Sequence, residues 1–258
     1  MEELEGFQFP NPRDPARVHG LAEEARRLLE ETDKAVMIHA PIGGVYEQSY
    51  WLRGIETLYR DMGGNRKYVE ALAERVLEWL LEFWDLVLEE VGPYVHVVEL
   101  SDDLGGQYGP LFSPKLYREV YKPRHRPLTE LIHSKTEAKI FLHCCGSIRW
   151  ALPDLIEVGI DIINPVQVSA REMETDRLKR EFGRDIVFWG GGADATGVLP
   201  FGSPSDVREE VKRRISDLAP GGGFVFGSVH NIQAEVPPEN VVAMFEAAYE
   251  YGGYPIAG

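Results

Sequence analysis

Residues 139–145 read KIFLHCC, a short apolar run that ends in a histidine and both cysteines of the chain. Such a run is typical of a buried strand, and its reactive residues lie at the carboxyl end. Five further runs have the same character, with apolar residues first and polar or small residues at the end. They are AVMIHAP (35–41), VHVVELSDD (95–103), IDIINPVQ (160–167), DIVFWGGG (185–192) and FVFGSVH (224–230).

Amphipathic segments separate these runs. They lie near 66–91, 115–134, 148–158, 172–182, 204–218 and 237–251. Strands that alternate with helices indicate an α/β fold with a parallel sheet. Polar residues at the ends of many different strands favour a (β/α)8 TIM-type barrel over an open doubly wound sheet. We therefore predict one barrel domain over residues 1–258, with six of the eight β-α units visible and an N-terminal extension and helix in 1–30.

Composition excludes several classes of protein. The chain has 258 residues and a formal charge of −15, from 42 acidic residues and 27 Lys and Arg. This balance repels phosphate backbones, so no nucleic-acid partner is expected. No stretch approaches the ~20 apolar residues of a membrane span, and the acidic start does not resemble a signal peptide. Adjacent cysteines are poorly placed for a disulfide, and we expect a reducing cytoplasmic setting.

The segment 66–91 has two apolar stripes. One follows Val69, Leu72 and Val76, and the other follows Leu77, Leu81 and Trp84. A helix that is apolar on two sides must bury both. A partner subunit, a missing segment or a long loop of the same chain would provide the cover, and these alternatives stay open.

The best candidate for chemistry is the pair His143 and Cys145. Residues two apart on a strand share a face, so these side chains point the same way and Cys144 points oppositely. Imidazole and thiolate are common zinc ligands, and His230 at the end of another strand is the best third ligand. Gln167 or Glu99 could add an oxygen. The plain alternative is a small core cysteine beside a histidine bonded to backbone.

Two acidic residues, Asp102 and Asp103, follow the strand at 95–101. They could orient a substrate or a metal-bound histidine, or they could simply form a turn. Ser113 and Pro114 predict the start of a helix. The glycines of WGGGADATG lack the GxGxxG spacing of a dinucleotide site and are better suited to a close approach of a ligand to the backbone.

Together these segments resemble the uroporphyrinogen decarboxylase superfamily, and within it the corrinoid-linked methyltransferases. The resemblance rests on DDLGGQYGPLFSPKLYREVYKPRHRPL, FLHCCGSIRWALPDLIEVGIDIINPVQ, FGRDIVFWGGGADA and APGGGFVFGSVHNIQAEVPPENVVAMFEA. It implies a (β/α)8 barrel with its site at the carboxyl ends of the strands. The methyltransferase branch binds zinc through a His-x-Cys pair and a later Cys, which matches His143 and Cys145. His230 stands at the place of the later Cys.

The resemblance implies a zinc-dependent methyltransferase that moves a methyl group between a corrinoid protein and a thiol or a tetrahydrofolate-type acceptor. Methylcobalamin carried by a partner protein would be the co-substrate. Asp103 and Gln167 are the candidate catalytic residues, and the candidate substrate contacts are Asp102, Gln107, Asn164 and Gly191.

Two alternatives accompany this prediction. One is a carboxy-lyase of the uroporphyrinogen decarboxylase type, and the other is a non-catalytic corrinoid- or tetrapyrrole-binding subunit. Few cationic residues, chiefly Arg149 and Arg171, fall in the loops after strands, which favours methyl transfer over a substrate with many carboxylates. The six visible units correspond in this resemblance to the third through eighth of the family, so we expect its first two β-α units to be absent. We therefore expect a homo-oligomer or hetero-oligomer that completes the barrel.

Overall fold

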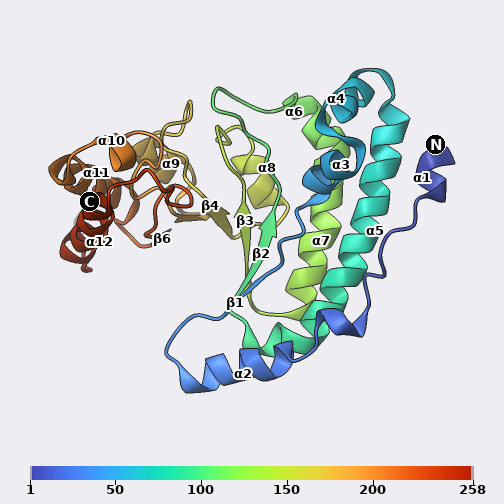
Figure 1. Cartoon of the computed structure of the whole chain (residues 1–258), viewed down its shortest axis with the longest axis horizontal. Coiled ribbons are helices and arrows are strands. Elements are labelled where there is room, and N and C mark those ends of the chain that lie inside the picture. The colour runs from blue at the N-terminus through green and yellow to red at the C-terminus, as the bar shows by residue number, and fades with distance from the viewer. Residues whose placement is uncertain (1, 257–258) are drawn as a thin grey trace. The chain divides into compact units, whose positions relative to one another are not determined.

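The computed structural model describes residues 2–256 and contains a six-stranded sheet in the order β1-β2-β3-β4-β5-β6. The pairs β1–β2, β4–β5 and β5–β6 are parallel. The strands are β1 (Met37–His39), β2 (Val97–Ser101), β3 (Lys139–His143), β4 (Ile162–Asn164), β5 (Val187–Trp189) and β6 (Phe224–Val225). Each strand lies inside one of the six predicted runs, so the α/β class with a parallel sheet is confirmed (Figure 1).

The chain divides into two compact units. The first comprises residues 1–103, 113–142 and 157–160, and the second comprises 104–112, 143–156 and 161–258. A single barrel domain over 1–258 stays a proposal.

The first unit is rich in helices. It contains α1 (Glu2–Gly6), η1 (Pro15–Arg17), α2 (Leu21–Glu31), α3 (Val45–Arg53), α4 (Ile55–Gly64), α5 (Arg66–Val91), η2 (Gly92–Tyr94), α6 (Pro114–Leu116), η3 (Tyr117–Tyr121) and α7 (Lys122–Lys135). The predicted segments 66–91 and 115–134 are confirmed, and the Ser113 side chain caps the start of α6 by accepting from the Leu116 N–H. Helices α3 and α4 were not predicted, because glycines at 43, 44, 54, 63 and 64 interrupt the apolar period there.

Both apolar stripes of α5 are covered within the first unit. Helices α2, α3, α4 and α7 all contact α5. Val69 and Val76 on one stripe are fully buried, and Leu77 and Trp84 on the other are nearly so, while Leu81 is half-buried. The first unit therefore covers most of both faces of this helix, as the alternative of cover by the same chain predicts.

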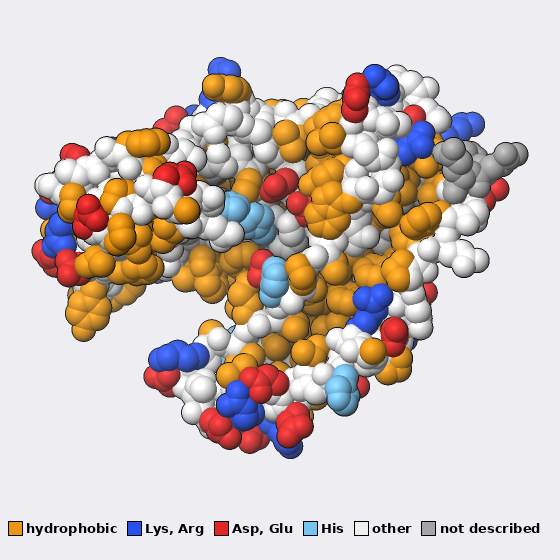
Figure 2. Space-filling model, viewed as in Figure 1, with side chains coloured by type: hydrophobic (Ala, Val, Ile, Leu, Met, Phe, Trp, Pro, Cys, Tyr) orange, Lys and Arg blue, Asp and Glu red, His pale blue; other side chains and the backbone are white. Residues whose placement is uncertain are grey.

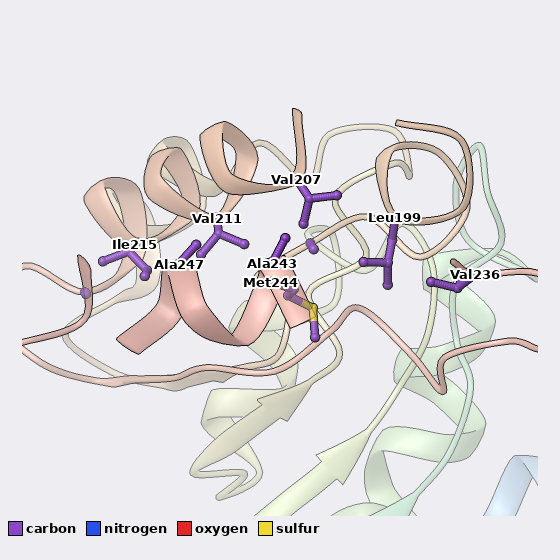
Figure 3. Close-up of a cluster of buried hydrophobic side chains, with 10 residues drawn as sticks. Leu199, Val207, Val211, Ile215, Val236, Ala243, Met244 and Ala247 are labelled. Atoms are coloured by element: carbon purple, nitrogen blue, oxygen red, sulfur yellow. The ribbon is translucent and has the colours of Figure 1, made fainter. Parts of the chain in front are cut away.

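The second unit contains α8 (Leu152–Glu157), α9 (Thr175–Phe182), α10 (Val198–Phe201), α11 (Pro204–Leu218) and α12 (Pro238–Tyr251). Helices α11 and α12 pack on each other, with Val207, Val211 and Ile215 facing Ala243 and Met244 (Figure 3). A capping box between Ser203 and Asp206 starts α11. This aliphatic core holds α11 and α12 together.

The described surface carries mixed charges, and helix α12 presents an apolar stripe. Arg27 pairs with Glu24 and Glu31 on α2, and Figure 2 shows acidic and basic side chains interspersed over that helix. On α12, Val242, Phe245 and Tyr249 are exposed at helical spacing. None of the helices in residues 2–256 is long and apolar enough to cross a bilayer.

Candidate metal centre

His143, Cys145 and His230 converge in the second unit. One potential ligand atom from each of the three lies within 4.8 Å of the other two. His143 ends β3 and Cys145 follows it, and the two side chains share a face, with Cys145 Sγ 3.3 Å from His143 Nε2. His230 comes from the segment after β6, and its ring meets the His143 ring edge-on at 5.4 Å between centroids. Residues two apart in an extended chain share a face, which pairs His143 with Cys145, and the tertiary fold brings His230 to them.

Cys144 has the opposite orientation. Its side chain is fully buried, and its sulfur accepts a hydrogen bond from the Leu104 N–H at 3.3 Å. A thiol used in this way fills the interior and satisfies a backbone donor. The two adjacent cysteines therefore occupy different environments, and only Cys145 is half-exposed at the site.

Asn164, at the end of β4, holds the His143 ring. Its Oδ1 lies 2.9 Å from His143 Nδ1, and its Nδ2 donates to the Trp189 carbonyl at the end of β5 at 3.1 Å. The sequence predicted that Asn164 touches substrate, and it did not predict the contact with His143. The signal was present in the polar ends of neighbouring strands, but their register could not be read from the sequence.

Gln167 and Gln107 brace the loop that follows Cys145. Gln167 Oε1 accepts from the Gly146 N–H at 2.8 Å, and Gln167 Nε2 donates to Gln107 Oε1 at 3.0 Å. Gln107 Nε2 in turn donates to the Ser169 carbonyl. Gly146 has φ of +87°, and a side chain there would clash with the backbone of Gly105. The loop carrying Cys145 is therefore packed against neighbouring backbone and tied by side-chain amides.

Gly191 follows β5 and has φ of +82°. A Cβ at this position would lie 2.7 Å from Val166 Cβ. The space above this glycine is thus occupied by Val166. Its predicted contact with substrate remains a prediction.

Asp102 and Asp103 belong to the first unit. Asp102 is 1% exposed and accepts from the Tyr46 and Glu47 N–H groups at the start of α3, at 3.1 and 2.8 Å. It also contacts His125 Nε2 at 2.9 Å, and His125 Nδ1 contacts the Tyr117 hydroxyl. Asp103 is half-buried just after β2. The buried network around Asp102 is used to start a helix, while the roles predicted for both residues stay proposals.

Glu47 is a buried acid that the sequence did not single out. Its carboxylate accepts from the Ser101 hydroxyl at 2.7 Å and the Gly44 N–H at 3.4 Å. Burial, followed by the charge of Asp102, raises the pKa of Glu47 to about 7. Glu99, considered above as an oxygen ligand, pairs instead with His39 across β1 and β2 at 2.9 Å.

The donor set of His143, Cys145 and His230 suits zinc. One thiolate and two imidazoles are ligands that zinc accepts, and catalytic zinc sites keep three protein ligands and one open position. Ligand atoms at usual zinc distances lie roughly 3.5 Å apart, close to the 3.3 Å between Cys145 Sγ and His143 Nε2. The bond from His143 Nδ1 to Asn164 matches the outer contact that zinc-binding histidines usually make. These residues fit the ion.

The chain belongs to the uroporphyrinogen decarboxylase family, whose model matches residues 1–251. Members of this family are enzymes. The comparison confirms the family predicted from the sequence, and with it the barrel-type fold class.

Two relatives illustrate the range of the family. A methyltransferase from Methanosarcina mazei superposes with a TM-score of 0.68 at 17% identity, over 92% of this chain and 65% of its own. A uroporphyrinogen decarboxylase from Alkalilimnicola ehrlichii is 40% identical over 50 residues, which is 19% of this chain and 14% of the relative. The chain thus spans less than two thirds of both relatives. The first shows the barrel-type fold, and neither assigns a reaction.

Proposed function

We propose that this protein is a zinc-dependent methyltransferase that moves a methyl group between a corrinoid protein and a thiol or a tetrahydrofolate-type acceptor. The observation that carries the proposal is the convergence of His143, Cys145 and His230 on one point. A buried structural cysteine would not need two imidazoles beside it.

His143 Nε2, Cys145 Sγ and one ring nitrogen of His230 would hold the ion. Zinc would supply a Lewis-acidic centre that keeps a substrate thiol deprotonated near neutral pH. With one thiolate and two neutral imidazoles, the site would carry a net charge of about +1, which favours an anionic fourth ligand such as a thiolate. Gln167 and Asp103 would orient substrate or the residues around it.

The metal content of the purified protein tests the proposal. We expect one zinc per chain in protein prepared without chelators, and its loss in Cys145→Ser. The matched control is Cys144→Ser, which changes the same atom one residue away on the buried face and should retain the metal. Wild-type protein without stoichiometric metal would contradict the proposed site.

The reaction is tested separately, with free methylcobalamin as methyl donor and a small thiol as acceptor. We expect loss of the methyl–cobalt absorbance in the presence of the zinc-loaded protein and not of Cys145→Ser. A metal-loaded protein that demethylates nothing would support a zinc site but contradict the methyl transfer.

A carboxy-lyase is the second candidate, because the family model and one relative carry that name. His230→Ala separates the two candidates. As a zinc ligand, His230 should be required for tight metal binding, and its replacement by Cys should restore it. In a carboxy-lyase the same change would leave metal content alone and weaken binding of the acidic substrate.

A corrinoid protein as partner, and assembly with further subunits, are part of the proposal. The corrinoid partner is what the resemblance of the sequence to corrinoid-linked methyltransferases implies. Light scattering at micromolar concentration tests assembly, and a single monomeric species would contradict it.

A further inference from the structure

Asn164 makes two hydrogen bonds that together determine which nitrogen of the His143 ring carries the hydrogen. The Trp189 carbonyl can only accept a hydrogen bond, so the Asn164 atom 3.1 Å away must be the amide nitrogen. The amide oxygen therefore faces His143 Nδ1 at 2.9 Å. Since that oxygen has no proton to give, Nδ1 must carry the hydrogen.

The neutral ring then has its lone pair on Nε2, which is 3.3 Å from Cys145 Sγ. In the metal-free protein the thiol can donate its proton to this nitrogen. The hydrogen bonds therefore all run in one direction: Cys145 donates to His143, His143 donates to Asn164, and Asn164 donates to the Trp189 carbonyl.

We infer that Asn164 is a positioning residue, which sets the tautomer and orientation of His143 and thereby presents Nε2 and Cys145 Sγ to the same ion. This inference rests on the proposed zinc site and reassigns Asn164 from substrate contact to support of a ligand. The Trp189 carbonyl orients the Asn164 amide, which in turn orients the His143 ring. Residues at the ends of three successive strands, β3, β4 and β5, therefore fix the position of His143 Nε2.

Gly190 contributes space for this arrangement. A Cβ at Gly190 would lie 3.2 Å from Asn164 Nδ2 and 3.0 Å from the Ser228 carbonyl. A larger residue would push the amide away from its two partners. The tight fit leaves the Asn164 side chain little freedom to turn.

The first test uses metal-free protein with 15N-labelled histidine, with the His143 signals assigned from their absence in His143→Gln. At a pH where the ring is neutral, NMR should find the hydrogen on Nδ1 in the wild type. In Asn164→Ala it should move largely to Nε2, the form that free imidazole side chains prefer in water. A wild-type ring protonated on Nε2, or an unchanged ring in Asn164→Ala, would overturn the inference.

The second test measures zinc and cobalt(II) affinity. Asn164→Ala should weaken binding by about 10- to 100-fold, as the loss of such outer contacts does in other metal sites. Asn164→Asp should restore most of the affinity, because its carboxylate also accepts from Nδ1. The control is Asn240→Ala, which removes a buried side-chain amide of the same unit that donates to the carbonyls of Leu199 and Gly202. Equal losses in Asn164→Ala and Asn240→Ala would point to general loosening and overturn the inference.

The two tests also separate this inference from the proposed function. If the protein bound no zinc but His143 carried its hydrogen on Nδ1 in an Asn164-dependent way, the zinc enzyme would be excluded and the positioning role would stand. If zinc bound normally to Asn164→Ala, the positioning role would fail and the zinc site would stand.

Discussion

Two histidine networks, one in each unit, use similar chemistry for different ends. In the first unit His125 lies between the Tyr117 hydroxyl and Asp102, and its side chain is 8% exposed. In the second unit His143 lies between Asn164 and Cys145 and is half-buried. In each ring, both nitrogens make a polar contact.

The difference lies in what completes each network. Asp102 directs its oxygens to the first N–H groups of α3 as well as to His125, so this network ends in backbone and supports the fold. The other ends in a half-exposed thiol with a second histidine beside it, so a ligand can still join it. The histidine is common to both networks. What distinguishes the structural network from the candidate site is burial and the final group, which is backbone N–H in the first and the Cys145 thiol in the second.

Asp102→Ala should have the largest effect on stability. It would leave the Tyr46 and Glu47 N–H groups at the start of α3 without their acceptor and His125 without its buried partner. We expect a loss of about 3–5 kcal/mol in the free energy of unfolding, measured by denaturant titration. Asp102→Asn keeps one acceptor oxygen and should lose less.

The same variants should not alter the zinc affinity of the folded protein, because Asp102 makes its bonds within the first unit. A loss of metal from folded Asp102→Ala protein, or a stability equal to that of the wild type, would break the distinction between the two networks.

Glu47→Gln should change how the free energy of unfolding depends on pH. The pKa of Glu47 is raised by burial from 4.5 to about 7. Below about pH 4.5 the acid is protonated in both folded and unfolded protein, so its contribution to stability is fully present. Between there and about pH 7 the unfolded chain releases the proton first, and stability falls; above about pH 7 the loss is complete.

The glutamine variant should therefore match the wild type at about pH 4 and exceed it by about 1–3 kcal/mol at about pH 8. Denaturant titrations across this range provide the measurement. The control is Glu23→Gln on α2, an exposed glutamate of the same unit that should show no such pH-dependent difference. A flat difference for Glu47→Gln as well would mean that Glu47 is ionised without penalty.

Gln167→Ala should have the smallest effect of the three. It removes the acceptor for the Gly146 N–H and so loosens the loop that carries Cys145. Zinc affinity, measured by competition with a chromophoric chelator, should fall roughly threefold to tenfold. Gln233→Ala, an exposed glutamine of the same unit, is the control. A fall in turnover with affinity unchanged would instead support the catalytic role predicted for Gln167.

Much of the fold follows from local pattern. The six apolar runs became strands, and the segments 66–91 and 204–218 became helices with the same bounds, because a strong periodicity or a capping box marks them. Helices α3 and α4 lack such a pattern. The start of α3 depends on Asp102, which accepts a hydrogen bond from the Tyr46 N–H, 56 residues earlier in the chain. No local sequence pattern predicts that bond.

The sequence by itself determined that His143 and Cys145 share a face and that Cys144 does not, because the period of a strand is two residues. It also indicated the family and the carboxyl ends of the strands as the place of the site. Only the tertiary structure decided that His230 reaches the pair, and that Asn164, 21 residues after His143, holds the ring and does not merely line the site. The physical reason is register. A pattern along one strand sets which way its side chains point, whereas the pairing of several strands sets which of those side chains meet.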